Sequence, residues 1–230
     1  MGAAEVLASV DIVALRLNNR DELELLLIRR AQEPFAGQWA LPGVLVNGRC
    51  ADHNLDAAAE RALGEKARVR PQHLEQVATI GNAVRDPRGW SLSTFYLALL
   101  APDVQLQGDD LCYVALAEVL GERFPLPFDH ALLVAQARER LAGKSVYTSL
   151  PLHLLLPRFT VTEALGAFQA ALGQAVQHTT LRGRLEKMKQ QGWIVDTGEK
   201  NYPKMGRPQN LLEHRPQAAG VFVFDRSVLS

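Results

Sequence analysis

The sequence predicts an α/β fold, in which a mixed sheet is sandwiched between helices, followed by a smaller winged helix-turn-helix. Strand-like and helix-like patterns alternate through residues 1–150, and several of the strands are joined as hairpins. Hairpin joins favour a mixed sheet over a purely parallel one. Residues 151–230 instead hold two helical patterns and a polar hairpin. We therefore expect two domains, 1–150 and 151–230, divided near the proline-bounded segment Pro151–Pro157.

The first domain begins with a predicted hairpin. Ser9–Leu17 alternates apolar residues and ends in a turn signal, after which Leu23–Arg30 forms the second strand. Gln38–Gly43 is expected to be a strand that runs into a tight glycine turn. Asp56–Glu65 is an alanine-rich stretch with helical spacing that Asn54 can cap. Its shared face consists of Leu55, Ala58, Ala59 and Leu63.

Two more strands and a helix complete this domain. The strands are Val77–Ile80 and Leu92–Leu100, and a turn-rich loop, Asn82–Gly89, separates them. Asp129 can cap a helix that runs from His130 to about Ala142. This helix leads toward the second domain, so it is the natural lever between the two.

The second domain opens with a capping box formed by Thr160 and Glu163, and Gly173 stops the helix that follows. A second, basic helix is expected to be capped by Thr179 or Thr180. Its buried stripe is Leu181, Leu185 and Met188, and it ends near Gly192. Gly183 lies inside it, where glycine costs about 1 kcal/mol relative to alanine.

A polar hairpin then completes the winged helix-turn-helix layout. Ile194-Val195 leads through Asp196–Glu199 into this glycine- and proline-rich hairpin, which ends near Leu211-Leu212. Within the remaining tail, Ala218–Ser230, the apolar stretch Val221–Phe224 is predicted to be an extra strand or a partner contact.

Charge is divided unequally between the two predicted domains. The chain has 25 Lys and Arg and 25 Asp and Glu, so its formal net charge is zero. Residues 1–150 hold 15 basic and 19 acidic residues, a balance of −4, whereas residues 151–230 hold 10 and 6, a balance of +4. The neutral total therefore does not argue against nucleic-acid binding by the second domain.

The composition excludes several protein classes. Hydrophobic residues make up 47% and charged residues 22%, which is unlike a disordered, collagen-like or low-complexity chain. No apolar run approaches the roughly 18 residues of a membrane span, and the start lacks a basic signal-peptide region. Cys50 and Cys112 form no disulfide framework and no CxxC motif. We expect both to be reduced, and the protein to be cytoplasmic.

The helix after Asn54 and the WALPG segment before it resemble the Nudix hydrolase domain. Its box, G-x5-E-x7-R-E-U-x-E-E-x-G-U with U a bulky aliphatic residue, holds Mg²⁺, which prefers oxygen ligands. Arg61, Leu63, Glu65 and Val69 match this box. The other positions depart from it: His53, Ala62 and Lys66 fill glutamate slots, Arg68 fills the glycine slot, and Val44 replaces the second glycine of the usual Pro-Gly-Gly.

These departures bear on catalysis. Glu65 is the one carboxylate left, and an ammonium at Lys66 would repel Mg²⁺. We therefore expect no metal and no hydrolysis, with Glu65 and Arg61 as remnants of the box. No other metal-ligand spacing is present in the sequence.

Three further segments resemble a subgroup, the Nudix-related transcriptional regulators of the NrtR type. They are the loop Arg85–Gly89, the segment Leu126–His130 and the junction from Leu152 to Thr160. The resemblance extends to about Glu213. It implies a homodimer that binds a palindromic DNA operator and is released by ADP-ribose or a related nucleotide. It also implies repression of genes of NAD metabolism.

Candidate contact residues follow. Guanidinium groups bind diphosphate, so the loop arginines are the best candidates for the nucleotide site. That site is expected to contain Arg30, Phe35, Trp39, Arg85, Asp86 and Arg88. For DNA, a helix fits the major groove while basic and hydroxyl side chains contact bases and phosphates. The expected DNA contacts are Thr179, Thr180, Arg182, Arg184, Lys187, Lys189, Lys200, Tyr202, Lys204 and Arg207.

Two rival functions remain open from the sequence. One is an active ADP-ribose pyrophosphatase with an appended DNA-binding domain, which needs metal ligands outside the box. The other is a nucleotide-binding module whose tail binds protein, because a basic helix face can also be merely solvated.

Overall fold

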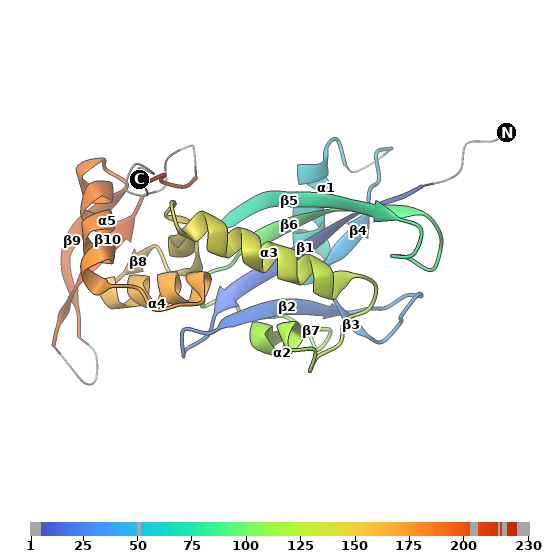
Figure 1. The fold of residues 1–230 in the computed structure, drawn as a ribbon, viewed down its shortest axis with the longest axis horizontal. Helices are drawn as coiled ribbons and strands as arrows, with labels where there is room; N and C mark the ends of the chain where they lie inside the picture. The colour runs from blue at the N-terminus through green and yellow to red at the C-terminus, as the bar shows by residue number, and fades with distance from the viewer. Residues whose placement is uncertain (1–5, 50–51, 203–206, 216, 218–219, 225–230) are drawn as a thin grey trace. The chain divides into compact units, whose positions relative to one another are not determined.

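The structure is a computed structural model that describes residues 6–49, 52–202, 207–215, 217 and 220–224. The chain forms two compact units. The first comprises Met1–Arg16, Leu23–Leu100 and Val104–Arg138, and the second comprises Leu17–Glu22, Ala101–Asp103 and Glu139–Ser230. Figure 1 shows the elements of each unit.

The first unit is built on a seven-stranded mixed sheet within the described residues. The main order is β3-β2-β1-β6-β5, with β4 paired to β1 and β7 paired to β2. Strands β1 and β6 are parallel, whereas the pairs β1–β4, β2–β3, β2–β7 and β5–β6 are antiparallel. The strands are β1 (Leu7–Leu17), β2 (Leu23–Arg29), β3 (Trp39–Ala40), β4 (Gly43–Leu45), β5 (His73–Asn82), β6 (Ser91–Leu99) and β7 (Leu111–Ala115).

The central strand β1 is buried on both faces, because successive side chains point to opposite sides of the sheet. Val10, Ile12 and Ala14 pack in one core cluster with helix α1 (Leu55–Arg61) and the π-helix Ala62–Ala67 that continues it. Val13 and Leu15, on the other face, are also fully buried. The mixed sheet with helical cover that the sequence predicts is thus confirmed.

Local predictions around α1 are confirmed with one exception. The Asn54 side chain accepts a hydrogen bond from the Ala57 amide at 2.8 Å, which caps the helix as expected. Ala58 and Leu63 are buried, but Leu55 is 36% exposed and does not belong to the buried face.

The glycine turn expected at Gly43 is wrong. Gly43 begins strand β4 and pairs with Asp11 of β1. A Cβ at Gly43 would collide with the carboxylate of Asp11 and lie 3.0 Å from the Val10 carbonyl oxygen. Glycine is therefore required here because another strand approaches closely, not because the chain turns.

The second unit contains the predicted helix-turn-helix and wing. Helix α4 (Val161–Leu172) has the capping box of Thr160 and Glu163, and Gly173 follows it with a left-handed φ of 72°. Helix α5 (His178–Gln190) buries Leu181, Leu185 and Met188, as predicted. Strands β8 (Arg158–Phe159), β9 (Ile194–Asn201) and β10 (Gln209–His214) form a sheet in the order β8-β10-β9.

One prediction in this unit is wrong. Thr179 and Thr180 do not cap α5, because the helix begins at His178 and the cap position is Gln177. The segment Asp196–Glu199, through which the chain was expected to enter the hairpin, lies within strand β9. Gly198 has a left-handed φ of 75°, close to an irregularity in the pairing of β9 with β10.

Helix α3 (His130–Ser145) spans the division between the units, which falls at Arg138 and Glu139. The predicted division after residue 150 lies further along the chain, inside the second unit. The C-terminal end of α3 belongs to that unit because Arg184 of α5 donates to the carbonyl oxygens of Ser145 and Val146, at 3.4 and 2.6 Å.

The remaining helices are short. They are α2 (Leu116–Leu120) and a 3-10 helix, Leu150–Leu154. Among the described residues, no helix has the length and apolar character needed to cross a membrane.

The described part of the tail, residues 220–224, packs within the second unit. Thr148 and Val223 form an isolated bridge, and the Phe224 amide donates to the Tyr147 carbonyl oxygen at 2.8 Å. Phe222 and Phe224 are buried. The stretch predicted as a strand or a partner contact is thus an extended segment held by its own chain.

Candidate effector site and nucleic-acid interface

The remnant of the Nudix box is organised around Arg61. Its guanidinium donates to both oxygens of Asp52, at 2.8 and 2.7 Å, and to the Leu45 carbonyl oxygen at 2.9 Å. The hydrogen bond from Arg61 holds the pKa of Asp52 at about 2. Glu65 lies 3.7 Å from Arg61 but is 62% exposed at its side chain. Arg61 of the box helix therefore binds Asp52, a carboxylate at a position that the Nudix box leaves unspecified.

The positions that depart from the box have contrasting surroundings. Ala62 is fully buried in the core, whereas His53 and Lys66 are exposed. Arg68 occupies the glycine slot and has a left-handed φ of 56°, a conformation that only glycine adopts at no steric cost. Among the described residues, no three His, Cys, Asp or Glu side chains converge as metal ligands.

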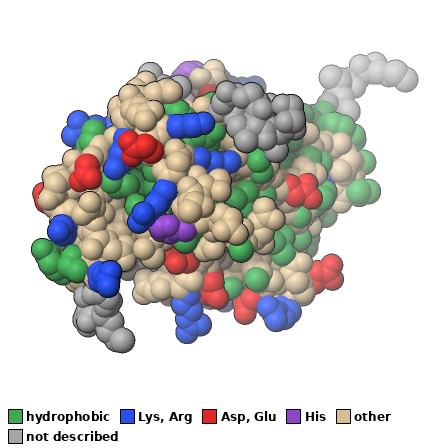
Figure 2. All heavy atoms as spheres, turned by 60° about the vertical axis from the view of Figure 1, so that its left-hand side comes forward, with side chains coloured by type: hydrophobic (Ala, Val, Ile, Leu, Met, Phe, Trp, Pro, Cys, Tyr) green, Lys and Arg blue, Asp and Glu red, His purple; other side chains and the backbone are tan. Residues whose placement is uncertain are grey.

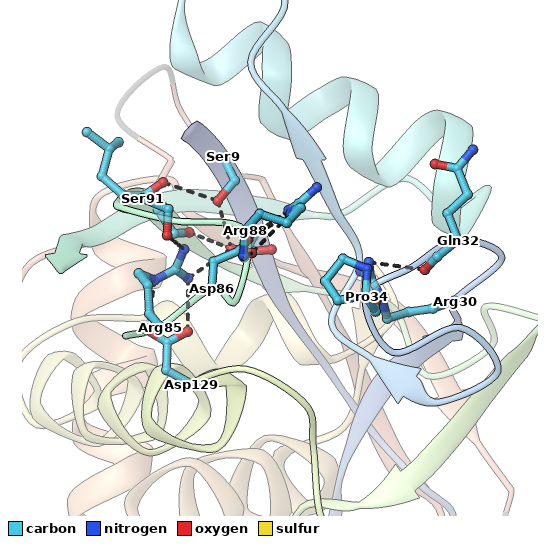
Figure 3. Close-up of polar contacts among 12 residues, drawn as sticks. Ser9, Arg30, Gln32, Pro34, Arg85, Asp86, Arg88, Ser91 and Asp129 are labelled. Carbon is cyan, nitrogen blue, oxygen red and sulfur yellow. Dashed lines mark hydrogen bonds and ion pairs between the residues drawn. The ribbon is translucent and has the colours of Figure 1, made fainter. Parts of the chain in front are cut away.

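Arg85 anchors the loop between β5 and β6 (Figure 3). It is 6% exposed, and its guanidinium donates to both oxygens of Asp129 at 2.9 Å. The same group lies 3.7 Å from Asp11 and 3.5 Å from the Ser91 hydroxyl. The donors of Arg85 thus face protein carboxylates, and the loop is fixed to the start of α3.

Asp86 and Arg88 form a second, local pair in that loop. Arg88 donates to both Asp86 oxygens, with the shortest distance at 2.7 Å, and the hydrogen bond from Arg88 lowers the pKa of Asp86. The Arg88 side chain is 40% exposed, so it reaches solvent. Its hydrogen bonds to Asp86 fix the orientation of the guanidinium group.

Arg30 stands opposite this loop in Figure 3. Its Nε donates to the Pro34 carbonyl oxygen at 2.8 Å, and its guanidinium lies 4.8 Å from the ring centre of Phe128. Burial lowers the pKa of Arg30 first, and the positive charge of Arg88 lowers it further. Two guanidinium groups that repel each other form a good site for an anion between them.

Two aromatic residues frame Arg30. Phe35 and Phe128 contact each other edge to face at 4.8 Å, and both have left-handed backbones, with φ of 67° and 56°. Non-glycine residues in this region are costly and gather at ligand sites. Trp39 lies in β3, where it pairs with Arg29 and is half-buried.

Sequence reasoning missed the buried polar cluster behind this site. Asp11 accepts from the Ser93 hydroxyl at 2.5 Å, and His130 Nε2 lies 3.8 Å from it. His130 Nδ1 accepts the Leu41 amide at 3.1 Å, so the neutral ring carries its proton on Nε2, toward Asp11. Burial lowers the pKa of His130. The signal was available, since Asp11 lies between the apolar residues Val10 and Ile12 in the central strand.

The expected DNA contacts on α5 have two kinds of surroundings. Thr179, Thr180, Arg182 and Lys187 are exposed. Arg184 is half-buried, because it donates to the end of α3 and stacks 4.8 Å from the ring centre of Phe224. The face of α5 that carries Arg184 therefore packs inside the second unit.

The wing carries the rest of the predicted set. Lys200 lies on β9, Tyr202 is 73% exposed, and Arg207 is exposed beside β10. Lys204 lies outside the described residues. Lys189, at the end of α5, lies 3.8 Å from Asp196 and is thus partly neutralised. In the view of Figure 2, basic side chains are interspersed with acidic ones on the surface.

Comparison with known proteins identifies the family. The NUDIX domain family matches residues 7–137. The "ADPR responsive transcriptional repressor NtrR" of Acinetobacter baylyi is 40% identical over 183 residues, which cover 78% of this chain and 72% of the relative. The chain belongs to the NrtR-type regulators of the Nudix family.

Solved structures of NrtR-type regulators agree over both units. Shewanella oneidensis NrtR complexed with a 27mer DNA superposes with a TM-score of 0.82 at 36% identity, covering 94% of this chain and 97% of that one. The NUDIX domain of the same protein, complexed with ADP ribose, has a TM-score of 0.54 at 40% identity, covering 60% and 90%. The fold predicted for this NrtR-type chain, a Nudix-like domain followed by a DNA-binding domain, is confirmed.

Proposed function

We propose that this protein is a transcriptional repressor that binds operator DNA through its second unit and releases it when the Nudix-like unit binds ADP-ribose or a related nucleotide. The observation that carries the proposal is the likeness over nearly the full chain to an NrtR protein in complex with DNA. A likeness confined to the Nudix domain would be equally compatible with a hydrolase.

The distribution of unpaired charge supports DNA binding. Within the described part of the second unit, Arg158 and Lys189 have acidic partners. Arg182 and Lys187 on α5, like Lys200 on the wing, are exposed and form no ion pair with a described residue. Positive charge without an internal partner is the property that attracts a phosphate backbone.

The nucleotide site is proposed to use Arg30, Phe35, Trp39, Arg85, Asp86 and Arg88. In this arrangement Arg30 and Arg88 bind the diphosphate, because both approach the same region and Arg88 is partly exposed. The buried Arg85 holds the loop in place through Asp129 rather than contacting the ligand. The contacting aromatic pair of Phe35 and Phe128 offers a surface for the base.

We also propose that the unit binds its nucleotide without hydrolysing it and needs no metal. Supporting this, three glutamate slots of the box hold His53, Ala62 and Lys66. The remaining Glu65 is aimed at Arg61, so it is already paired with a cation of the protein. An active pyrophosphatase would need a carboxylate cluster to neutralise a diphosphate.

A homodimer is proposed as the binding form, because a palindromic operator presents two equivalent half-sites and calls for a two-fold symmetric protein.

Fluorescence anisotropy tests the function directly. A labelled duplex from the region upstream of the protein's own operon is titrated with the full chain, with and without ADP-ribose. We expect salt-sensitive binding that ADP-ribose weakens. Absence of salt-sensitive binding would reject the repressor function in favour of a protein-binding tail.

Turnover of ADP-ribose is measured on the same preparation with Mg²⁺ or Mn²⁺. We expect none. Hydrolysis that is lost in the variant Glu65→Ala would instead establish the protein as a pyrophosphatase with an appended DNA-binding domain.

A further inference from the structure

A glycine stands on the exposed face of helix α5. Gly183 is exposed, and a Cβ built on it would meet no heavy atom within 4 Å. Packing within the described part of the chain therefore does not require glycine at this position. Yet glycine is, after proline, the residue least suited to a helix interior. Gly183 therefore lowers the stability of α5, and no contact within the described part of the chain explains its presence.

The gap left by this glycine is surrounded by polar side chains. Helical spacing places Thr179 and Thr180 one turn before Gly183, and Glu186 and Lys187 one turn after it. All four are exposed. The glycine therefore lies at the centre of the outward face of α5, among groups that can donate or accept hydrogen bonds.

The surroundings of this gap favour a polyanion. Arg182 and Lys187 flank it and have no ion pair with a described residue, and Glu186 is the single acid of α5. A groove of about 510 Å³ runs alongside, between α5 and the wing. Its lining includes Arg182, Glu186, Gln209 and Asn210, which carry the donors and acceptors that read base edges.

We propose that Gly183 is the point where the backbone of α5 comes into van der Waals contact with duplex DNA. A helix enters the major groove only as deeply as its outward side chains allow. Without a side chain at Gly183, the helix can approach until Thr179, Arg182 and Lys187 reach bases and phosphates around it. This inference rests on the proposed DNA-binding function and names the residue that sets the docking depth.

The test compares Gly183 with a second exposed helical glycine that lies outside the proposed DNA-binding helix. Gly143, in the last turn of α3, is also exposed and also has no neighbour within 4 Å of a built Cβ. Alanine at either site should raise Tm, by about 2–4 °C, because alanine favours the helix. Only Gly183→Ala should weaken binding to the operator duplex, by about tenfold or more.

A graded series sharpens the comparison. Gly183→Leu should weaken DNA binding further than Gly183→Ala, whereas Gly143→Leu should leave the affinity within about twofold of the wild type. Anisotropy titrations at one salt concentration give the affinities, and thermal melts confirm that each variant is folded.

The possible failures are distinguishable. If the wild type binds the duplex and Gly183→Ala binds it as tightly or more tightly, the inference is overturned while the DNA-binding function stands. A fall of Tm in Gly183→Ala would also overturn it, because the glycine would then serve the packing of the chain itself. If the wild type does not bind the duplex, the proposed function fails first and the inference falls with it.

Discussion

Arg182 and Arg184 are two residues apart in α5 and have opposite surroundings. Arg182 is exposed and lines the groove beside the wing, whereas Arg184 is half-buried against the end of α3 and Phe224. The sequence predicts both as DNA contacts. It could not separate them, because the groups that cover Arg184 come from residues 145–146 and 224, which are distant in sequence.

Substituting Arg184 should therefore affect stability. Arg184→Ala removes the donor to two carbonyl oxygens and the cover of an aromatic ring, so we expect a loss of about 1–2 kcal/mol in the free energy of unfolding. Lys187→Ala, at an exposed position without a described partner, should change it by less than about 0.5 kcal/mol. Urea denaturation measures both. An unchanged midpoint in Arg184→Ala combined with loss of DNA binding would show instead that Arg184 contacts DNA.

A buried histidine should make stability depend on pH. His214 is 9% exposed, and burial lowers its pKa to about 4 from 6.5. Between these values the unfolded chain binds more protons than the folded chain, so stability falls as the pH decreases from about 6.5 toward 4. His214→Gln should flatten this part of the stability profile, measured by urea denaturation across the range. A profile as steep as that of the wild type would contradict the assignment.

At the scale of elements, the sequence predicted what local patterns determine. The hairpin of β1 and β2, the strands β5 and β6, and the capping box of α4 depend on alternation, turn residues and a four-residue motif. The error at Gly43 arose because a segment distant in sequence decides the structure there: Asp11 of β1 pairs with Gly43 and its carboxylate lies against it.

The candidate site was predictable to a similar degree. The loop arginines followed from their residue types, but the partner that buries Arg85 is Asp129, which is 44 positions away. Likewise, Asp52 was missed because its role comes from the side chain of Arg61. Sequence spacing could not supply these pairs, since they depend on how the sheet brings its loops together.

Helix α5 and the wing should each contribute to the salt dependence of DNA binding. A phosphate contact releases about 0.9 counterion, so each lost contact reduces the slope of log K against log salt by about that amount. Lys187→Gln and Lys200→Gln are expected to do so individually and, in the double variant, additively. Lys189→Gln should change the slope less, because Asp196 already neutralises part of that charge. Equal slopes for all variants would place the phosphate contacts elsewhere.

For the whole molecule, the neutral net charge is the sum of an acidic first domain and a basic second domain. The acidic half has lost most of the carboxylates of its box, and the basic half keeps its unpaired charges on one helix and the wing. Composition averaged over the chain therefore gave no indication of a nucleic-acid partner. The separate charge balances of the two predicted domains do indicate such a partner. The likeness over nearly the full chain to a relative in complex with DNA agrees with this indication.

Two ligands on one chain must affect each other equally. If ADP-ribose lowers the affinity for the operator by some factor, about 5- to 150-fold for typical coupling, the operator must lower the affinity for ADP-ribose by the same factor. Calorimetric titration of ADP-ribose with and without saturating duplex measures the second factor. Unequal factors would mean that the nucleotide also binds at a second site.

The tail has a genetic consequence. The extended stretch that ends at Phe224 supplies the ring beneath Arg184 and a backbone bond to Tyr147. A nonsense codon in place of Gly220 would leave every proposed DNA-contacting residue encoded but remove these supports. We expect such an allele to behave as a loss of repression, and a screen for constitutive expression to recover stop codons at or near codon 220.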